Sequence, residues 1–153
     1  MRKKIFIAAY IIYFMPMALV AQERLQGLFE GTLTVGGLES SRKLRIELFL
    51  RFTGREISGR SYVYLEKGQM VEMELRGYMY RDFSVYLQEI RHIPPDRPDQ
   101  VRPPYFRKYQ LQYSGNFEEV KLNGFWQEET AQPLSTGRAI GKVSLRKVKG
   151  SKA

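Results

Sequence analysis

Apolar and polar residues alternate with a period of two along most of this chain, and this pattern constrains the fold more than any other feature. The clearest case is KLRIELFLRF at residues 43–52, where every second residue is apolar and the others, apart from Phe49, are charged. Successive side chains of a β-strand point to opposite faces, so this pattern is typical of a half-buried strand. Similar alternation predicts strands at residues 29–35, 43–52, 57–65, 71–79, 83–89, 108–114, 120–126 and 138–148.

Short links with turn-forming residues separate most of these segments, as at Gly36-Gly37, Thr53-Gly54 and Gly115-Asn116. Parallel pairing needs crossovers of about a dozen residues or more, and most links are too short for that. No stretch has the pattern of a long helix. The sequence therefore predicts an all-β fold, an antiparallel up-and-down meander of about eight strands.

Five glycines lie within the predicted strands, at positions that share the parity of the apolar residues. A glycine weakens a strand unless a sharp bend or a close backbone approach requires it. Repeated on the inward face, glycine indicates strongly coiled strands that close on each other. A small barrel or half-barrel is therefore favoured over a flat sandwich. The five are Gly31, Gly59, Gly77, Gly124 and Gly141.

Short motifs in these strands carry a resemblance that covers most of residues 28–148. In chain order they are FEGTL, ISGRSYVYL, MELRGYM, FSVYLQE and VKLNGFW. They resemble the small exported β-meander proteins of Gram-negative bacteria with a lipocalin-like or avidin-like (calycin-type) barrel. VKLNGFW matches the late L-x-G-x-W strand of that group and contains the only tryptophan, Trp126. The resemblance implies a barrel and, for lipocalin-like members, a small ligand inside it.

The first 21 residues have the composition of a secretory signal peptide. A basic start, MRKK, precedes an apolar run from Ile5 to Val20, and LVA precedes Gln22. An uncleaved membrane anchor is the rival interpretation, although a full span needs about 20 apolar residues. We expect cleavage after Ala21.

The remaining chain is expected to form one β-barrel-like domain over residues 22–149, with a short tail at 150–153 and no transmembrane segment. The expected location is the periplasm, the outer-membrane surface or the extracellular space. The chain contains no cysteine, so its core must hold the domain together without disulfides.

The chain is basic, with a formal net charge of +9. Removing the signal peptide, which contains three cations and no acidic residue, leaves +6. Outside the cytoplasm such a charge favours lipid head groups, acidic polysaccharides or acidic protein surfaces over nucleic acid. The alternative is that the charge serves solubility alone.

A proline-rich stretch, RHIPPDRPDQVRPPYFRKYQ at residues 91–110, holds five of the seven prolines. Proline cannot donate a hydrogen bond to a sheet, so a strand should end near Ile93. The stiff loop over residues 91–107 is longer than a hairpin requires, which favours a projecting contact element over an idle spacer. Its candidate contact residues are Arg97, Arg102, Tyr105, Phe106 and Arg107.

A second candidate surface is a group of tyrosines on the polar face of neighbouring predicted strands. Tyrosine and arginine are enriched in binding surfaces, and Arg60 and Arg76 share this face. Ordinary cross-strand pairing is one alternative, and tyrosines that point inward and line a pocket are another. The tyrosines proposed for binding are Tyr62, Tyr64, Tyr78 and Tyr80.

Glu89 continues the expected inward parity of Phe83, Val85 and Leu87. Near a barrel mouth it would pair with an inward arginine or bind a polar ligand group; alternatively, the strand ends there and Glu89 meets water. His92 stands without a cluster of metal-ligating residues, and nucleophile and phosphate-binding motifs are lacking. We therefore predict no catalytic site, metal or cofactor.

Taken together, these features predict an exported, non-enzymatic binding or accessory protein of the bacterial cell envelope. It would contact a protein or an anionic polymer through the proline-arginine-aromatic loop and the tyrosine-rich face. The alternative is a lipocalin-like carrier with a small apolar ligand inside the barrel.

Overall fold

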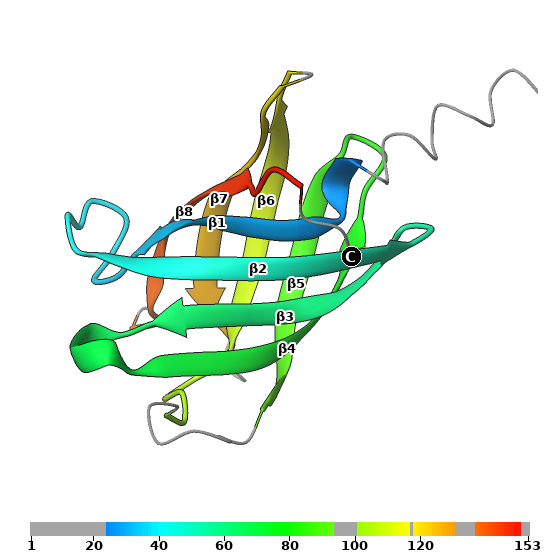
Figure 1. Cartoon of the computed structure of the whole chain (residues 1–153). Coiled ribbons are helices and arrows are strands. Elements are labelled where there is room, and N and C mark those ends of the chain that lie inside the picture. Colours follow the sequence, from blue (N-terminus) through cyan, green and yellow to red (C-terminus); the bar gives the residue numbers. More distant parts are fainter. Residues whose placement is uncertain (1–23, 94–100, 117, 131–136, 151–153) are drawn as a thin grey trace, which may run out of the picture.

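A computed structural model describes residues 24–93, 101–116, 118–130 and 137–150. Eight antiparallel strands follow one another around a closed barrel, in which each strand pairs with the next and β8 returns to β1 (Figure 1). This confirms the all-β meander and decides for a closed barrel over a half-barrel. The elements are β1 (Gly27–Thr34), β2 (Lys43–Thr53), β3 (Glu56–Tyr64), the 3-10 helix η1 (Glu66–Gly68), β4 (Met70–Met79), β5 (Ser84–His92), β6 (Arg107–Gly115), β7 (Val120–Glu128) and β8 (Ile140–Lys147).

Large apolar side chains from all eight strands point inward and pack into one cluster. Trp126, Tyr109 and Phe29 are the largest of the fully buried side chains. The Trp126 indole Nε1 donates a hydrogen bond to the backbone oxygen of Thr34 at 2.8 Å, so its polar atom is satisfied inside the barrel. The predicted inward position of Trp126 is confirmed.

Inward-facing glycines let neighbouring strands of the barrel approach closely. A Cβ atom added at Gly59 would lie 2.0 Å from the backbone oxygen of Phe49, and one at Gly124 would lie 2.0 Å from that of Gln110. Real Cβ atoms do not approach backbone oxygens so closely, so only glycine fits at these positions. The expectation that these glycines serve close backbone approach is confirmed.

A β-bulge extends β5 beyond its predicted end at residue 89. Leu75 pairs with Glu89, whereas Glu74 pairs with Arg91, so Ile90 is the extra residue. A bulge changes the alternation of side chains along a strand. Glu89 points into the barrel in step with Val85 and Leu87, and the bulge after it places Arg91 on the outer wall beside Glu74.

The two ends of the barrel differ in their connections. One end, called the turn end below, carries the tight turns between β2 and β3 and between β4 and β5, together with the start of β1. The other, called the loop end, carries the β1–β2 loop, η1 and residues 101–106. No helix within the described ranges is both long enough and apolar enough to span a membrane.

Candidate functional site

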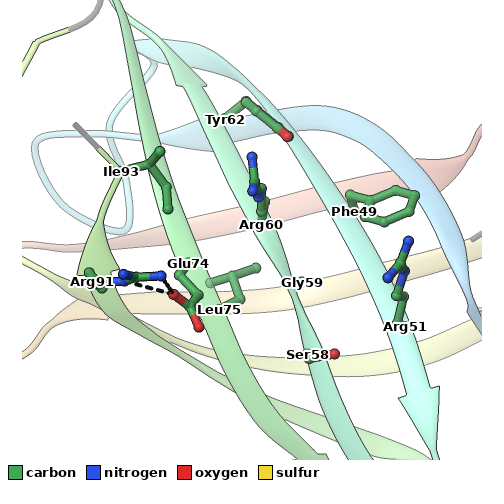
Figure 2. A pocket seen from close by; sticks show the side chains of 10 residues that line it. All are labelled: Phe49, Arg51, Ser58, Gly59, Arg60, Tyr62, Glu74, Leu75, Arg91 and Ile93. Carbon is green, nitrogen blue, oxygen red and sulfur yellow. Dashed lines mark hydrogen bonds and ion pairs between the residues drawn. The ribbon is translucent and has the colours of Figure 1, made fainter. Parts of the chain in front are cut away.

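Four charged side chains, Arg51, Arg60, Glu74 and Arg91, surround one hollow on the outer wall of β2 to β5. The strand register places four outward side chains in one row, because Phe49 pairs with Arg60, Arg60 with Glu74, and Glu74 with Arg91. Around this row the wall forms a cavity of about 500 Å³, which we call the outer hollow (Figure 2). Its lining residues are Phe49, Arg51, Ser58, Gly59, Arg60, Tyr62, Glu74, Leu75, Arg91 and Ile93.

Three guanidinium groups stand around the outer hollow, two of them held by carboxylates. Arg60 Nη1 donates to Glu72 Oε1 at 2.6 Å, and Arg91 Nε donates to Glu74 Oε2 at 2.8 Å. Figure 2 shows Arg60 between Phe49 and the Arg91–Glu74 pair. Arg51 lies over the Phe49 ring, 5.5 Å from its centroid. Guanidinium groups fixed in this way keep further N–H donors free for a ligand.

Arg60 and Tyr62 in the outer hollow both hold protonated forms that donate hydrogen bonds. The hydrogen bond and charge of Glu72 raise the pKa of Arg60, which stays protonated. Burial raises the pKa of the Tyr62 phenol, and the charge of Glu72 raises it further, so the hydroxyl keeps its proton. Three cations face two carboxylates here, and an anion with oxygen acceptors matches these donors.

The four tyrosines predicted as a binding face lie on the outer wall, but in two separate groups. Tyr62 lines the outer hollow, and the Tyr64 hydroxyl donates to Glu47 Oε2 at 3.2 Å. Tyr78 and Tyr80 lie at the turn end, in edge-to-face contact at 5.5 Å between ring centroids. The alternative in which these tyrosines line an internal pocket is wrong, because they lie on the polar side of their strands.

Glu89 lies inside the barrel near the loop end and is fully buried. It accepts hydrogen bonds from Ser61 Oγ at 3.0 Å, from the Tyr109 hydroxyl at 2.7 Å and from the backbone N–H of Arg107 at 2.8 Å. Arg107 Nη1 lies 3.5 Å from Glu89 Oε1. Of the interpretations left open for Glu89, pairing with an inward arginine agrees with this geometry, and exposure to water does not.

Arg107 corrects the interpretation of the proline-rich loop. It was expected to project from the loop as a contact residue, yet it is only 3% exposed, because it begins β6 with the same inward parity as Tyr109. Its guanidinium lies 5.2 Å from the ring centroid of Tyr105 and 5.4 Å from that of Trp126. These two rings stack on each other at 6.0 Å. Tyr105 and Arg107 thus help to close the loop end.

Charges and burial act in opposite directions on Arg107. Burial lowers the pKa of its guanidinium, but Tyr109 and Glu89 outweigh this effect, so the pKa is raised and the cation is kept. Its Nε and Nη1 atoms have no hydrogen-bond partner among the described residues. The Tyr105 and Trp126 rings contribute cation–π contacts to this guanidinium.

The described part of the proline-rich loop lies against the barrel. The Val101 N–H donates to the backbone oxygen of Met70 at 2.9 Å, and His92 Nε2 lies 3.2 Å from the Val101 oxygen. Arg102 is exposed and Phe106 is half-buried. Arg97 lies outside the described residues. The loop contacts named from the sequence therefore do not form one described surface.

Sequence reasoning missed Phe49, Arg51, Ser58 and Arg91 as members of a site. Alternation in the sequence shows that Phe49, Arg51 and Ser58 face outward. It does not show the strand register that brings them together with Arg91. Within the described residues, no group of three histidine, aspartate or glutamate side chains could hold a metal ion.

Comparisons of the chain with protein-family models, with curated proteins and with solved structures found no match, so function is inferred from the geometry itself.

Proposed function

We propose that this protein is an exported, non-enzymatic binding module of the bacterial cell envelope, and that it holds an anionic polymer in the outer hollow of β2 to β5. The observation that carries this proposal is the convergence of Arg51, Arg60 and Arg91 on one concave surface that also contains Tyr62 and Phe49. Export is supported by the basic and apolar N-terminal sequence.

The chemistry of the outer hollow favours an acidic polysaccharide. Guanidinium groups bind carboxylates with two parallel hydrogen bonds, and the Tyr62 and Ser58 hydroxyls suit the oxygens of a sugar. The Phe49 ring offers a flat apolar face beside Arg51. The hollow lies on the outer wall of β2 to β5, outside the closed barrel.

A carrier function has less support from the barrel interior. The inward side chains of the described strands pack together in one cluster, and the charged pair of Glu89 and Arg107 lies within the loop end. The outer hollow and three other hollows of the described chain are lined mainly by outward-facing residues of the wall.

The test is a binding titration with polygalacturonate, an acidic polysaccharide, and with dextran as the neutral comparison. The parent protein should bind the acidic polymer only, and binding should weaken as salt rises. Changing Arg51, Arg60 and Arg91 together to Gln should lower affinity by about tenfold or more and reduce the salt dependence.

A matched control removes three arginines elsewhere on the surface: Arg42, Arg45 and Arg146, each of which is ion-paired like Arg60 and Arg91. Changing these three to Gln should leave most of the affinity intact. If this control weakens binding as much as the triple change in the outer hollow, general charge attraction explains the binding. If the parent protein fails to bind, the proposal is wrong.

A further inference from the structure

The turn between β4 and β5 holds a phenylalanine in a backbone conformation that suits glycine. The Phe83 N–H donates to the Tyr80 oxygen at 3.2 Å, and the Tyr80 N–H donates to the Ser84 oxygen at 2.9 Å. This tight geometry gives Phe83 a φ of 61°, in the left-handed region. The inward position predicted for Phe83 is wrong, because this residue belongs to the turn before β5 and is exposed. A bulky residue is rare there, and glycine or asparagine would be less strained. Observed strain of this kind is a reason to look for a use of the side chain.

Aromatic side chains gather on the outside of this turn. Tyr78, Tyr80 and Phe83 are 40%, 51% and 45% exposed, and they make up half of the six strongly exposed large apolar residues of the described chain. The two tyrosine rings contact each other edge to face. We call these three residues and the turn that carries them the aromatic tip. An exposed apolar ring and two exposed tyrosines on one hairpin match the side chains that gather at a membrane–water interface.

Two arginines border the aromatic tip. Arg55 and Arg81 line the same open hollow, of about 740 Å³, as Tyr78 and Tyr80. Neither has a carboxylate partner within the described part of the chain. Asp82 does not neutralise them by pairing, because its carboxylate accepts the Ser84 N–H at 3.1 Å and the Ser84 hydroxyl at 2.6 Å. Two arginines against the one carboxylate of Asp82 leave the lining of this hollow with a net positive charge, which is complementary to phosphate groups.

The aromatic tip lies at the end of the barrel where the N-terminal segment joins. Gly27, the first residue of β1, pairs with Leu50 near the end of β2, and the β2–β3 and β4–β5 turns lie at this same end. The apolar run from Ile5 to Val20 precedes it in the chain. The turn end is therefore the end of the barrel at which the described chain leads back toward this apolar run.

We propose that the aromatic tip is a lipid-docking site for an anionic membrane surface. Phe83 enters the region between head groups and acyl chains, Tyr78 and Tyr80 lie at head-group level, and Arg55 and Arg81 pair with lipid phosphates. A protein partner fits less well, since a stable protein interface needs about 800 Å² on each side and the tip is a single hairpin end. This site lies apart from the outer hollow and does not depend on the proposed function.

The test measures co-sedimentation with vesicles of phosphatidylethanolamine containing about one third phosphatidylglycerol, against pure phosphatidylcholine. The chain from Gln22 onward is used, because it contains all eight strands of the closed barrel and lacks the apolar run. It should sediment with the anionic vesicles and much less with the neutral ones. Phe83→Asn should lower the partition coefficient by about tenfold, since it removes the apolar ring.

Phe83→Asn should melt at the same temperature as the parent chain or higher, because asparagine tolerates the left-handed conformation. Phe125→Asn is the matched control, since Phe125 is another exposed phenylalanine, on the wall of β7. It should leave vesicle binding unchanged. Changing Arg55 and Arg81 to Gln should lower binding by about tenfold, whereas the same change at Lys43 and Arg102, at the loop end, should have little effect.

Three results would overturn the proposal. The first is a parent chain that sediments with neither kind of vesicle. The aromatic tip would then be a candidate site for a protein partner instead of a lipid surface. The second is Phe125→Asn weakening vesicle binding as much as Phe83→Asn. The third is folded Phe83→Asn protein that binds the anionic vesicles as well as the parent.

Discussion

Glu89 and Arg107 are the residues whose roles depend most on their surroundings. Both side chains are nearly inaccessible to water, and they meet inside the barrel although their positions differ by 18 residues. An isolated buried charge is very costly, and a partner with well-placed hydrogen bonds offsets most of that cost. Tyr109 and Ser61 supply two of those hydrogen bonds to Glu89. The cluster therefore depends on all of its members.

Glu89→Gln should lower the free energy of unfolding by about 3–5 kcal/mol, because it leaves the buried Arg107 without its counter-charge. Adding Arg107→Met should recover part of this loss, so the double variant should be more stable than the sum of the single effects predicts. Urea unfolding of the four proteins gives the comparison. Glu74→Gln, which breaks the exposed pair with Arg91, is the control and should cost less than about 1 kcal/mol. Strict additivity would contradict a coupled pair.

Tyr109 should make the protein sensitive to alkaline pH. Burial raises the pKa of the Tyr109 phenol well above its usual value, and the charge of Glu89 raises it further. A raised folded-state pKa means that this stability is complete below the unfolded-state pKa of about 10 and is lost as pH rises above it. At pH 7, Tyr109→Phe should lower the free energy of unfolding by about 1–2 kcal/mol relative to the parent, because Glu89 loses a hydrogen bond.

The stability difference between Tyr109→Phe and the parent should narrow above about pH 10, because only the parent must keep this phenol protonated in order to fold. Chemical unfolding from neutral to alkaline pH measures it. A difference that stays constant over this range would show that Tyr109 does not titrate in the folded protein in the expected way.

Among the elements, β3 shows how a strand serves two surfaces. Gly59 and Ser61 lie on its inward face. Gly59 allows β2 to approach closely, and the Ser61 hydroxyl donates a hydrogen bond to Glu89. Its outward face carries Arg60 and Tyr62 into the outer hollow. A change on the inward face should therefore disturb the fold, and a change on the outward face should disturb binding alone.

Gly59→Ala should destabilise the barrel by about 3 kcal/mol, at the upper end of overpacking effects, because the new methyl group would meet the backbone of β2 rather than a movable side chain. Gly137→Ala is the matched control, since nothing lies within 4 Å of the added Cβ and its φ is not in the left-handed region. This control should melt close to the parent. Equal melting temperatures for both variants would contradict the close approach of β2 and β3.

The β-bulge at Ile90 is the second element that shapes the site. Without it, Arg91 would share the inward parity of Glu89, and the outer hollow would lack one of its three arginines. Alternation in the sequence cannot reveal such an insertion, because one extra residue reverses the parity of everything that follows it in the strand. The bulge thus places the Arg91 guanidinium outside the barrel, two residues after the inward carboxylate of Glu89.

For the whole molecule, the proposed export predicts the residue at which the mature chain begins. The basic start, the apolar run and the LVA end predict that the exported protein begins at Gln22. Intact-mass measurement of the protein recovered from its native location gives the answer. A species that retains residues 1–21 and stays with membranes after alkaline washing would show that this segment is an anchor.

The sequence by itself determined the strands, the meander and the inward side of most strands. Each predicted strand overlaps an observed one, and the parity of Trp126 and of the strand glycines was correct, because these follow from local alternation and backbone geometry. Inward pairing of Glu89 was one of two interpretations that the sequence left open.

Only the tertiary structure decided which residues share a surface. Closure of β1 on β8 and the row from Phe49 through Arg60 and Glu74 to Arg91 depend on register between strands. Register is set by how all eight strands pack around one core, and alternation within a single strand carries no record of it. The same holds for Arg107. The prolines before it led to its prediction as a loop residue, whereas the structure buries it beside Glu89. A buried carboxylate requires a cation as its partner.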